Sequence, residues 1–170
     1  MGGYAALAMF RQEPSRITGL VLADTRAPAD TAEGRAGRVR MRAALAEHGP
    51  RAVADQMLPK LLSADAPPEL AADVRAMIES CDPRAIDAAI DALLNRPDAT
   101  PDLPRISSTT LIVVGEEDTV TPRADAEALE RGIPRSRLTV IPGAGHLSNL
   151  EAAGSFDEGL AGHLARCGLV

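Results

Sequence analysis

Three short apolar segments set the strongest constraint on how this chain can fold. They cover residues 17–23, 109–114 and 138–141, and helical patterns separate each segment from the next. Apolar runs of this length without polar alternation are typical of parallel strands, which are buried on both faces. Strands that alternate with helices predict an α/β fold with three parallel strands and flanking helices.

Helix signals lie before, between and after these segments. An apolar face predicts an N-terminal helix that Pro14 ends, and a second helix is expected over residues 121–132. Ser148 and Glu151 have the spacing of a capping box, in which a serine caps a helix and a glutamate three residues later binds back. We therefore expect Ser148 to cap the final helix.

Residues 28–105 have helical periodicity and almost no strand signal. Residues 95–104 contain three prolines and predict a linker. We expect a core of residues 1–27 and 106–170, interrupted by a helical insertion and its linker over residues 28–105. The simplest interpretation of the apolar stripes in this insertion is helix packing; they are Leu70, Val74, Met77 and Ile78, then Ile86, Ile90, Leu93 and Leu94.

Charge and composition argue against several kinds of partner. The 170 residues carry a net charge of −6, with one tyrosine, two phenylalanines and no basic run, so a nucleic-acid partner is not expected. No apolar stretch reaches the ~18 residues of a membrane span, and the N-terminus lacks signal-peptide features. Cys81 and Cys167 form no CxxC pair, which suits a reducing compartment. The expected location is the cytoplasm, with no membrane partner, and the pattern carries no signal for oligomeric state.

Three polar residues follow the three apolar segments. Asp24 follows the first, Asp118 the second and His146 the third. Carboxyl ends of parallel strands meet at one edge of a sheet, where ligands and catalytic groups gather. A histidine that a carboxylate orients can act as a general base, because imidazole titrates near neutral pH. From the pattern alone, Asp118 or Asp24 could be that carboxylate. If the residues have no catalytic role, Asp24 binds nearby backbone and His146 is an ordinary hydrogen-bonded loop residue.

Two segments together resemble the α/β-hydrolase family. Residues 113–122, Val-Val-Gly-Glu-Glu-Asp-Thr-Val-Thr-Pro, are similar to the acid-bearing turn of these enzymes, and Pro-Gly-Ala-Gly-His at 142–146 is similar to their histidine loop. The acid precedes the histidine, as in the family's Ser…Asp…His order. The resemblance thus implies Asp118 as the favoured acid, with Asp24 as the alternative because some members of the family place the acid after the matching strand. Residues 28–105 fall where such enzymes insert a cap domain. Residues 23–26 and 31–35 resemble the branch that includes 3-oxoadipate enol-lactonase-like hydrolases.

The resemblance also implies where the nucleophile lies. In the family the nucleophile elbow reads G-x-S-x-G and commonly continues as Ser-Met-Gly-Gly-Tyr, whereas this chain opens Met-Gly-Gly-Tyr. The chain is thus expected to start directly after the nucleophilic serine, with the Met1 N–H as an oxyanion-hole donor. No nucleophile is expected within the chain itself, since Ser148 is assigned as a helix cap and neither cysteine lies near the strand ends.

The resemblance implies serine-type hydrolysis of a small-molecule ester or lactone, with no metal and no organic cofactor. Without the serine, the 170-residue chain alone is expected to be inactive. Cofactor-free haloperoxidase or perhydrolase chemistry, which uses the same triad, is one alternative. A non-catalytic fragment or binding module is another, and the DNA upstream of the Met1 codon would discriminate between these cases.

Overall fold

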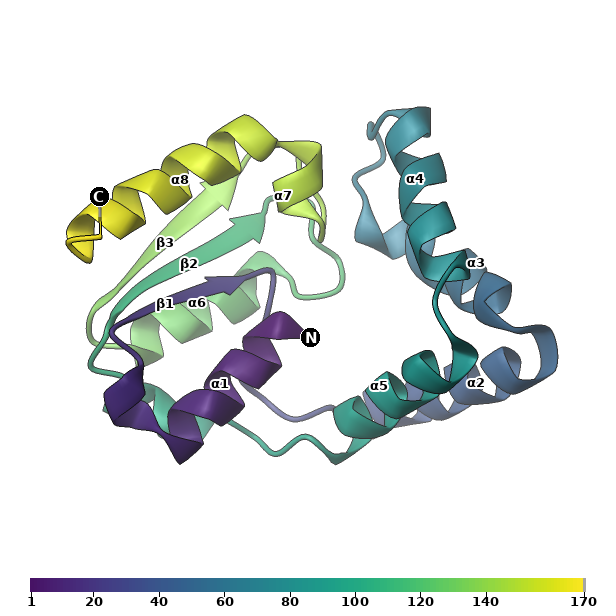
Figure 1. Ribbon diagram of the computed structural model, residues 1–170, viewed down its shortest axis with the longest axis horizontal. Coiled ribbons are helices and arrows are strands. Elements are labelled where there is room, and N and C mark those ends of the chain that lie inside the picture. Colours follow the sequence, from purple (N-terminus) through teal and green to yellow (C-terminus); the bar gives the residue numbers. More distant parts are fainter. Residues whose placement is uncertain (170) are drawn as a thin grey trace.

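A computed structural model describes residues 1–169 and contains one sheet of three parallel strands (Figure 1). The strands are β1 (Gly19–Ala23), β2 (Thr109–Gly115) and β3 (Ser136–Ile141), in the order β1-β2-β3. Strand β2 therefore pairs on both sides. The predicted α/β architecture with three parallel strands is confirmed.

Different helices cover the two faces of the sheet. Helices α1 (Gly2–Gln12) and α6 (Arg123–Gly132) pack on one face, and α8 (Ala153–Arg166) packs on the other (Figure 1). Alternation along β1 separates the faces, since Leu22 joins the α1 and α6 cluster whereas Val21 joins the α8 cluster. Strand β2 has helices on both sides, so its residues 110–115 are all buried.

Four helices stand beside the sheet as a separate bundle, called here the helical segment (Figure 1). They are α2 (Ala32–His48), α3 (Pro50–Leu61), α4 (Pro68–Glu79) and α5 (Pro83–Asn95). Leu45, Val53 and Ile90 are buried in a cluster of the segment's own. Most of the apolar stripes pack inward as expected, but Met77 is 56% exposed. No helix within residues 1–169 has both the length and the apolar character to cross a membrane.

Element boundaries differ from the sequence prediction where short helical turns intervene. A 3-10 turn η1 (Pro14–Arg16) takes Ile17 as its cap, so β1 begins at Gly19. The proline-rich linker contains a second turn, η2 (Thr100–Arg105). Helix α6 begins at Arg123 rather than at Thr121-Pro122.

The predicted capping box at Ser148 is wrong. Ser148–Glu151 forms a helix of its own, α7, and the final helix α8 begins at Ala153 without a side-chain cap. The Ser148 hydroxyl and the Glu151 carboxylate instead bind residues distant in the sequence. Long-range polar contacts have therefore replaced a local one.

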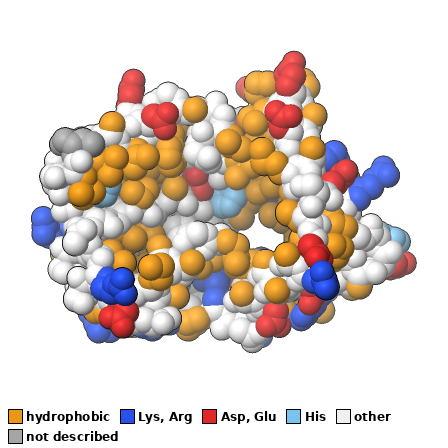
Figure 2. Space-filling view, in the orientation of Figure 1, with side chains coloured by type: hydrophobic (Ala, Val, Ile, Leu, Met, Phe, Trp, Pro, Cys, Tyr) orange, Lys and Arg blue, Asp and Glu red, His pale blue; other side chains and the backbone are white. Residues whose placement is uncertain are grey.

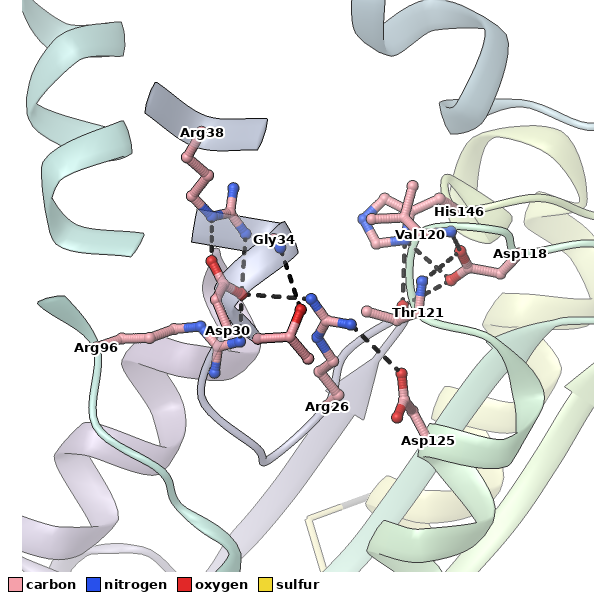
Figure 3. A network of polar contacts seen from close by, with 11 residues as sticks. Arg26, Asp30, Gly34, Arg38, Arg96, Asp118, Val120, Thr121, Asp125 and His146 are labelled. Carbon is pink, nitrogen blue, oxygen red and sulfur yellow. Dashed lines mark hydrogen bonds and ion pairs between the residues drawn. The ribbon is translucent and has the colours of Figure 1, made fainter. Parts of the chain in front are cut away.

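Both connections between the sheet and the helical segment meet at one buried carboxylate, Asp30, whose side chain is 1% exposed. Arg38 binds it from α2, Arg96 from the end of α5 at 2.9 Å, and Arg26 from the β1–α2 connection at 3.3 Å (Figure 3). The Arg96 guanidinium also lies over the Tyr4 ring of α1, 4.0 Å from its centroid. Burial raises the pKa of Asp30, but the hydrogen bonds from Arg38 and Arg96 outweigh it and hold the pKa below 3.8. We call this cluster the Asp30 joint.

Asp30→Asn should destabilise the fold, because it leaves several guanidinium groups without their shared counter-charge. We expect a loss of about 3 kcal/mol in the free energy of unfolding, near the lower end for breaking a buried ion pair, since Arg26 and Arg38 keep some contact with water. Urea unfolding followed by circular dichroism would measure it. Asp91→Asn is the matched control: Asp91 is 55% exposed and 3.4 Å from Arg42, so its loss should change stability by less than about 1 kcal/mol. Equal losses in the two variants would contradict the role given to the joint.

Candidate active site

Asp118 and His146 meet at the carboxyl end of the sheet. Asp118 lies in the turn after β2 and His146 in the loop after β3, and Oδ2 of Asp118 is 2.9 Å from Nδ1 of His146 (Figure 3). The Asp118 side chain is fully buried, whereas that of His146 is 20% exposed. A carboxylate only accepts hydrogen bonds, so Nδ1 carries the proton in this pair and Nε2 is left as the basic nitrogen.

The carboxylate of Asp118 is held from its own turn as well. Oδ1 accepts the backbone N–H groups of Val120 at 2.8 Å and of Thr121 at 2.9 Å, and Oδ2 accepts the Thr121 hydroxyl at 2.8 Å. Burial raises the pKa of Asp118, but the hydrogen bonds from His146 and Thr121 more than offset it, so the pKa lies below 3.8. The acid is therefore ionised and oriented over the whole range in which an imidazole titrates.

Close backbone packing positions the loop that carries His146. Gly143 has a φ of +66°, which favours glycine, and its N–H donates to Glu116 at 3.2 Å. The Glu117 N–H donates to the carbonyl of Ala144 at 2.8 Å. The loop thus lies directly against the turn that carries the acid.

Asp24 lies at the same edge of the sheet but binds other partners. Its Oδ1 accepts the N–H of Gly115 at 3.0 Å, and its Oδ2 accepts the hydroxyl of Ser148 at 2.6 Å. Burial raises the pKa of Asp24, although the hydrogen bonds from Ser148 and Gly115 partly oppose the increase. Asp24 thus binds backbone at the end of its strand, as one of the two interpretations of this residue expected. Asp118 is the carboxylate that contacts His146.

Met1 and His146 line a common hollow of about 360 Å³, together with residues of β1 and Phe156 of α8. Helix α1 begins at Gly2, so its N-terminal N–H groups and the positive end of its dipole lie beside this hollow. Within residues 1–169, no hydroxyl or thiol is hydrogen-bonded to Nε2 of His146. His146 and the N-terminus of α1, which favours negative charge, therefore border the same hollow.

A larger cavity of about 640 Å³ lies between the helical segment and the acid turn. Leu58, Leu62 and Ala71 line it from the helical segment, and Glu117 and Thr119 line it from the turn. The space-filling view shows hydrophobic side chains around the hollow between the two parts of the molecule (Figure 2). This volume lies within the range of small-molecule sites, which are mostly apolar with a few polar groups.

Three residues of this region make contacts that were not predicted from the sequence. Thr121 was expected to start a helix but binds Asp118, and its spacing of three from an aspartate is a turn signal that could have indicated the contact. Ser148 donates to Asp24 from 124 positions away, and Glu151 accepts from Ser63 at a separation of 88. No local pattern signals contacts of that range.

The chain matches the alpha/beta hydrolase family over residues 1–158. It therefore belongs to the α/β hydrolase family. A thermophilic esterase from Thermogutta terrifontis, solved with malate bound, is 36% identical, with a TM-score of 0.93 over 98% of this chain and 62% of the esterase. The enol-lactonase from Burkholderia xenovorans LB400 is 26% identical, with a TM-score of 0.87 over 97% of this chain and 63% of that one.

A stretch of the polyketide synthase ThaQ from Burkholderia thailandensis is also 40% identical over 88 residues, which is 49% of this chain and 4% of the synthase. The chain thus spans less than two thirds of the length of each of these relatives.

The two carboxylates should affect stability with opposite dependence on pH. The lowered pKa of Asp118 contributes stability that is present above its unfolded value of about 3.9 and is lost as the pH falls through the folded pKa. The raised pKa of Asp24 gives the reverse: its contribution is lost as the pH rises from the unfolded to the folded value.

Urea unfolding between about pH 3 and 7 should therefore show a shallower loss of stability in acid for Asp118→Asn than for the unaltered chain. In the unaltered chain, the contribution of Asp24 to stability falls as the pH rises above about 4, and Asp24→Asn should remove this fall. Asp157→Asn, an exposed change on α8, serves as the control and should leave the profile unchanged. Parallel profiles for the two site variants would contradict the opposite shifts.

Proposed function

We propose that this chain forms the acid and histidine part of a serine-type hydrolase that cleaves small-molecule esters or lactones. The observation that carries the proposal is the buried Asp118 carboxylate bound to Nδ1 of a partly exposed His146 at 2.9 Å. The same histidine borders the hollow at the N-terminus of α1. A base held by a buried acid and bordering a helix N-terminus matches the part of an acyl-transfer site that acts on a nucleophile.

In the proposed mechanism, Asp118 holds the imidazole in the tautomer with its proton on Nδ1. Nε2 of His146 takes the proton from a serine hydroxyl as the serine attacks the carbonyl carbon, and later returns it to the leaving alcohol. Water then cleaves the acyl-enzyme with the help of the same nitrogen. Thr121 supports the acid by donating to Oδ2, the oxygen that also contacts His146.

We place the serine in a segment that precedes Met1 in the whole protein. Two facts support this proposal: the chain spans 62% of the esterase it matches, and Met1 lies beside His146 at the shared hollow. There the Met1 N–H, as a peptide amide, would help to stabilise the tetrahedral oxyanion. Such stabilisation is usually the largest single contribution to the rate.

The substrate class follows from the relatives and the larger cavity. The two structures described above are named an esterase and an enol-lactonase, and both names refer to cleavage of a carboxylic ester bond. We propose that residues 28–105 act as a cap that binds the apolar part of the substrate in the 640 Å³ cavity against the acid turn.

Asp118→Asn should lower kcat by about 10⁴-fold in a form of the protein that carries the serine, because an asparagine favours the wrong imidazole tautomer. Hydrolysis of p-nitrophenyl esters would measure the effect. Asp24→Asn is the matched control, since Asp24 lies at the same edge but contacts Gly115 and Ser148, and its effect should be far smaller. Equal losses, or a larger loss at Asp24, would assign the acid to the other carboxylate.

Turnover should also depend on residues upstream of Met1. We expect no measurable hydrolysis of p-nitrophenyl esters by the 170-residue chain, and hydrolysis by a chain extended with the family's upstream strands and serine elbow. Turnover by the unextended chain that His146→Ala abolishes would overturn the proposed position of the nucleophile. A folded, extended chain without any turnover would favour a binding module instead.

A further inference from the structure

The loop that carries His146 is packed between two parts of the molecule. The turn after β2 lies on its sheet side, where Glu117 binds the Ala144 carbonyl at 2.8 Å. The end of α3 lies on the other side: a Cβ built on Gly145 would be 2.7 Å from Ser63 N and 2.8 Å from the Leu62 carbonyl carbon. Side chains do not tolerate backbone atoms at those distances. The position of the loop therefore depends on the helical segment as well as on the sheet.

The carboxylate of Glu151 joins these two sides. Its Oε1 accepts the N–H of Gly145 at 2.8 Å, and its Oε2 accepts the N–H of Ser63 at 2.8 Å. The Leu147 N–H, on the other side of the histidine, donates to the Leu61 carbonyl at 3.0 Å. Of the two amides that flank His146, that of Leu147 is thus bound by the helical segment itself. That of Gly145 is bound by the Glu151 carboxylate, which also binds the helical segment at Ser63.

We propose that Glu151 is a positioning residue that couples the docking of the helical segment to the orientation of His146. If the end of α3 moves away from the sheet, Glu151 loses Ser63, Leu147 loses Leu61, and the loop loses the packing at Gly145 in the same event. Displacement of the helical segment then releases the histidine from Asp118. The catalytic meaning of this coupling rests on the proposed hydrolase function, whereas the coupling itself does not.

A purely local role for Glu151 predicts something different. Glu151 is the last residue of the short helix α7, and its bond to Gly145 alone would serve to close the loop between residues 145 and 151. In that case its loss would change Gly145 and its immediate neighbours. It would leave the contact between the Leu147 N–H and the Leu61 carbonyl in place, because the Glu151 carboxylate is hydrogen-bonded to Gly145 and Ser63 and to neither of these two groups.

Glu151→Gln is the test, because glutamine keeps the size of the side chain but presents one acceptor and one donor to two N–H groups. We expect the amide of Leu147 to exchange with solvent at least about tenfold faster, the scale expected when a charged hydrogen bond is lost. The low-field NMR signal of the His146 Nδ1 proton should broaden or disappear. Both reporters lie outside the hydrogen bonds that the substitution removes.

Glu158→Gln is the matched control, since Glu158 is exposed on α8 and its carboxylate makes no hydrogen bond to another described residue. Glu151→Asp provides a second variant: it keeps the charge but shortens the reach, so it should lose one of the two bonds and give the same changes if the glutamine variant fails to fold. Faster exchange at Gly145 and Ser63, with Leu147 and the His146 proton unchanged, would overturn the coupling.

A kinetic measurement separates this inference from the proposed function. In a chain that hydrolyses esters, Glu151→Gln should lower kcat, because His146 is no longer held against Asp118. It should also raise KM, because Ser63 lines the cavity and loses its bond to Glu151. If a folded chain extended with the serine elbow shows the exchange changes but hydrolyses no ester, the coupling stands and the hydrolase function is rejected. If the enzyme is active and Glu151→Gln changes neither amide exchange nor kcat, the hydrolase function stands and the coupling is rejected.

Discussion

The close approach of three strand-end loops around Gly115 is the constraint on which the rest of the site depends. The Gly115 N–H donates to Asp24 after β1 at 3.0 Å, and its carbonyl accepts the N–H of Asp118 at 3.1 Å. A Cβ at this position would lie 2.1 Å from the carbonyl oxygen of Gly145 in the His146 loop. Any side chain there would push the histidine loop away from the acid, so the backbone of one glycine sets the spacing of the candidate pair.

Much of this arrangement can be predicted from the sequence, because it depends on local pattern. The apolar segments identify the three strands, and the residues that follow them identify Asp118 and His146 as neighbours. A parallel sheet brings its carboxyl ends together whatever the details of packing. The flanking helices follow from the same kind of pattern, whereas the order of the strands comes from the structure.

The sequence does not predict the contacts that hold the loops, because they join positions far apart in the chain. The capping-box interpretation of Ser148 and Glu151 failed for this reason: both side chains had a plausible local partner, and tertiary contacts with Asp24 and Ser63 replaced it. The same is true of the Asp30 joint, where Arg96 reaches across 66 positions. Polar residues near helix ends are therefore poor guides to their own partners when loops from several strands converge on them.

The cation–π contact at the Asp30 joint has a spectroscopic consequence. The chain contains one tyrosine and no tryptophan, and the ring of that tyrosine lies 4.0 Å from the guanidinium carbon of Arg96. Near-ultraviolet fluorescence and dichroism of the unlabelled chain therefore arise chiefly from the place where α1, the end of α5 and the buried carboxylate meet. The molecule carries an intrinsic optical reporter of whether its helical segment is attached to its sheet, independent of its overall helix content.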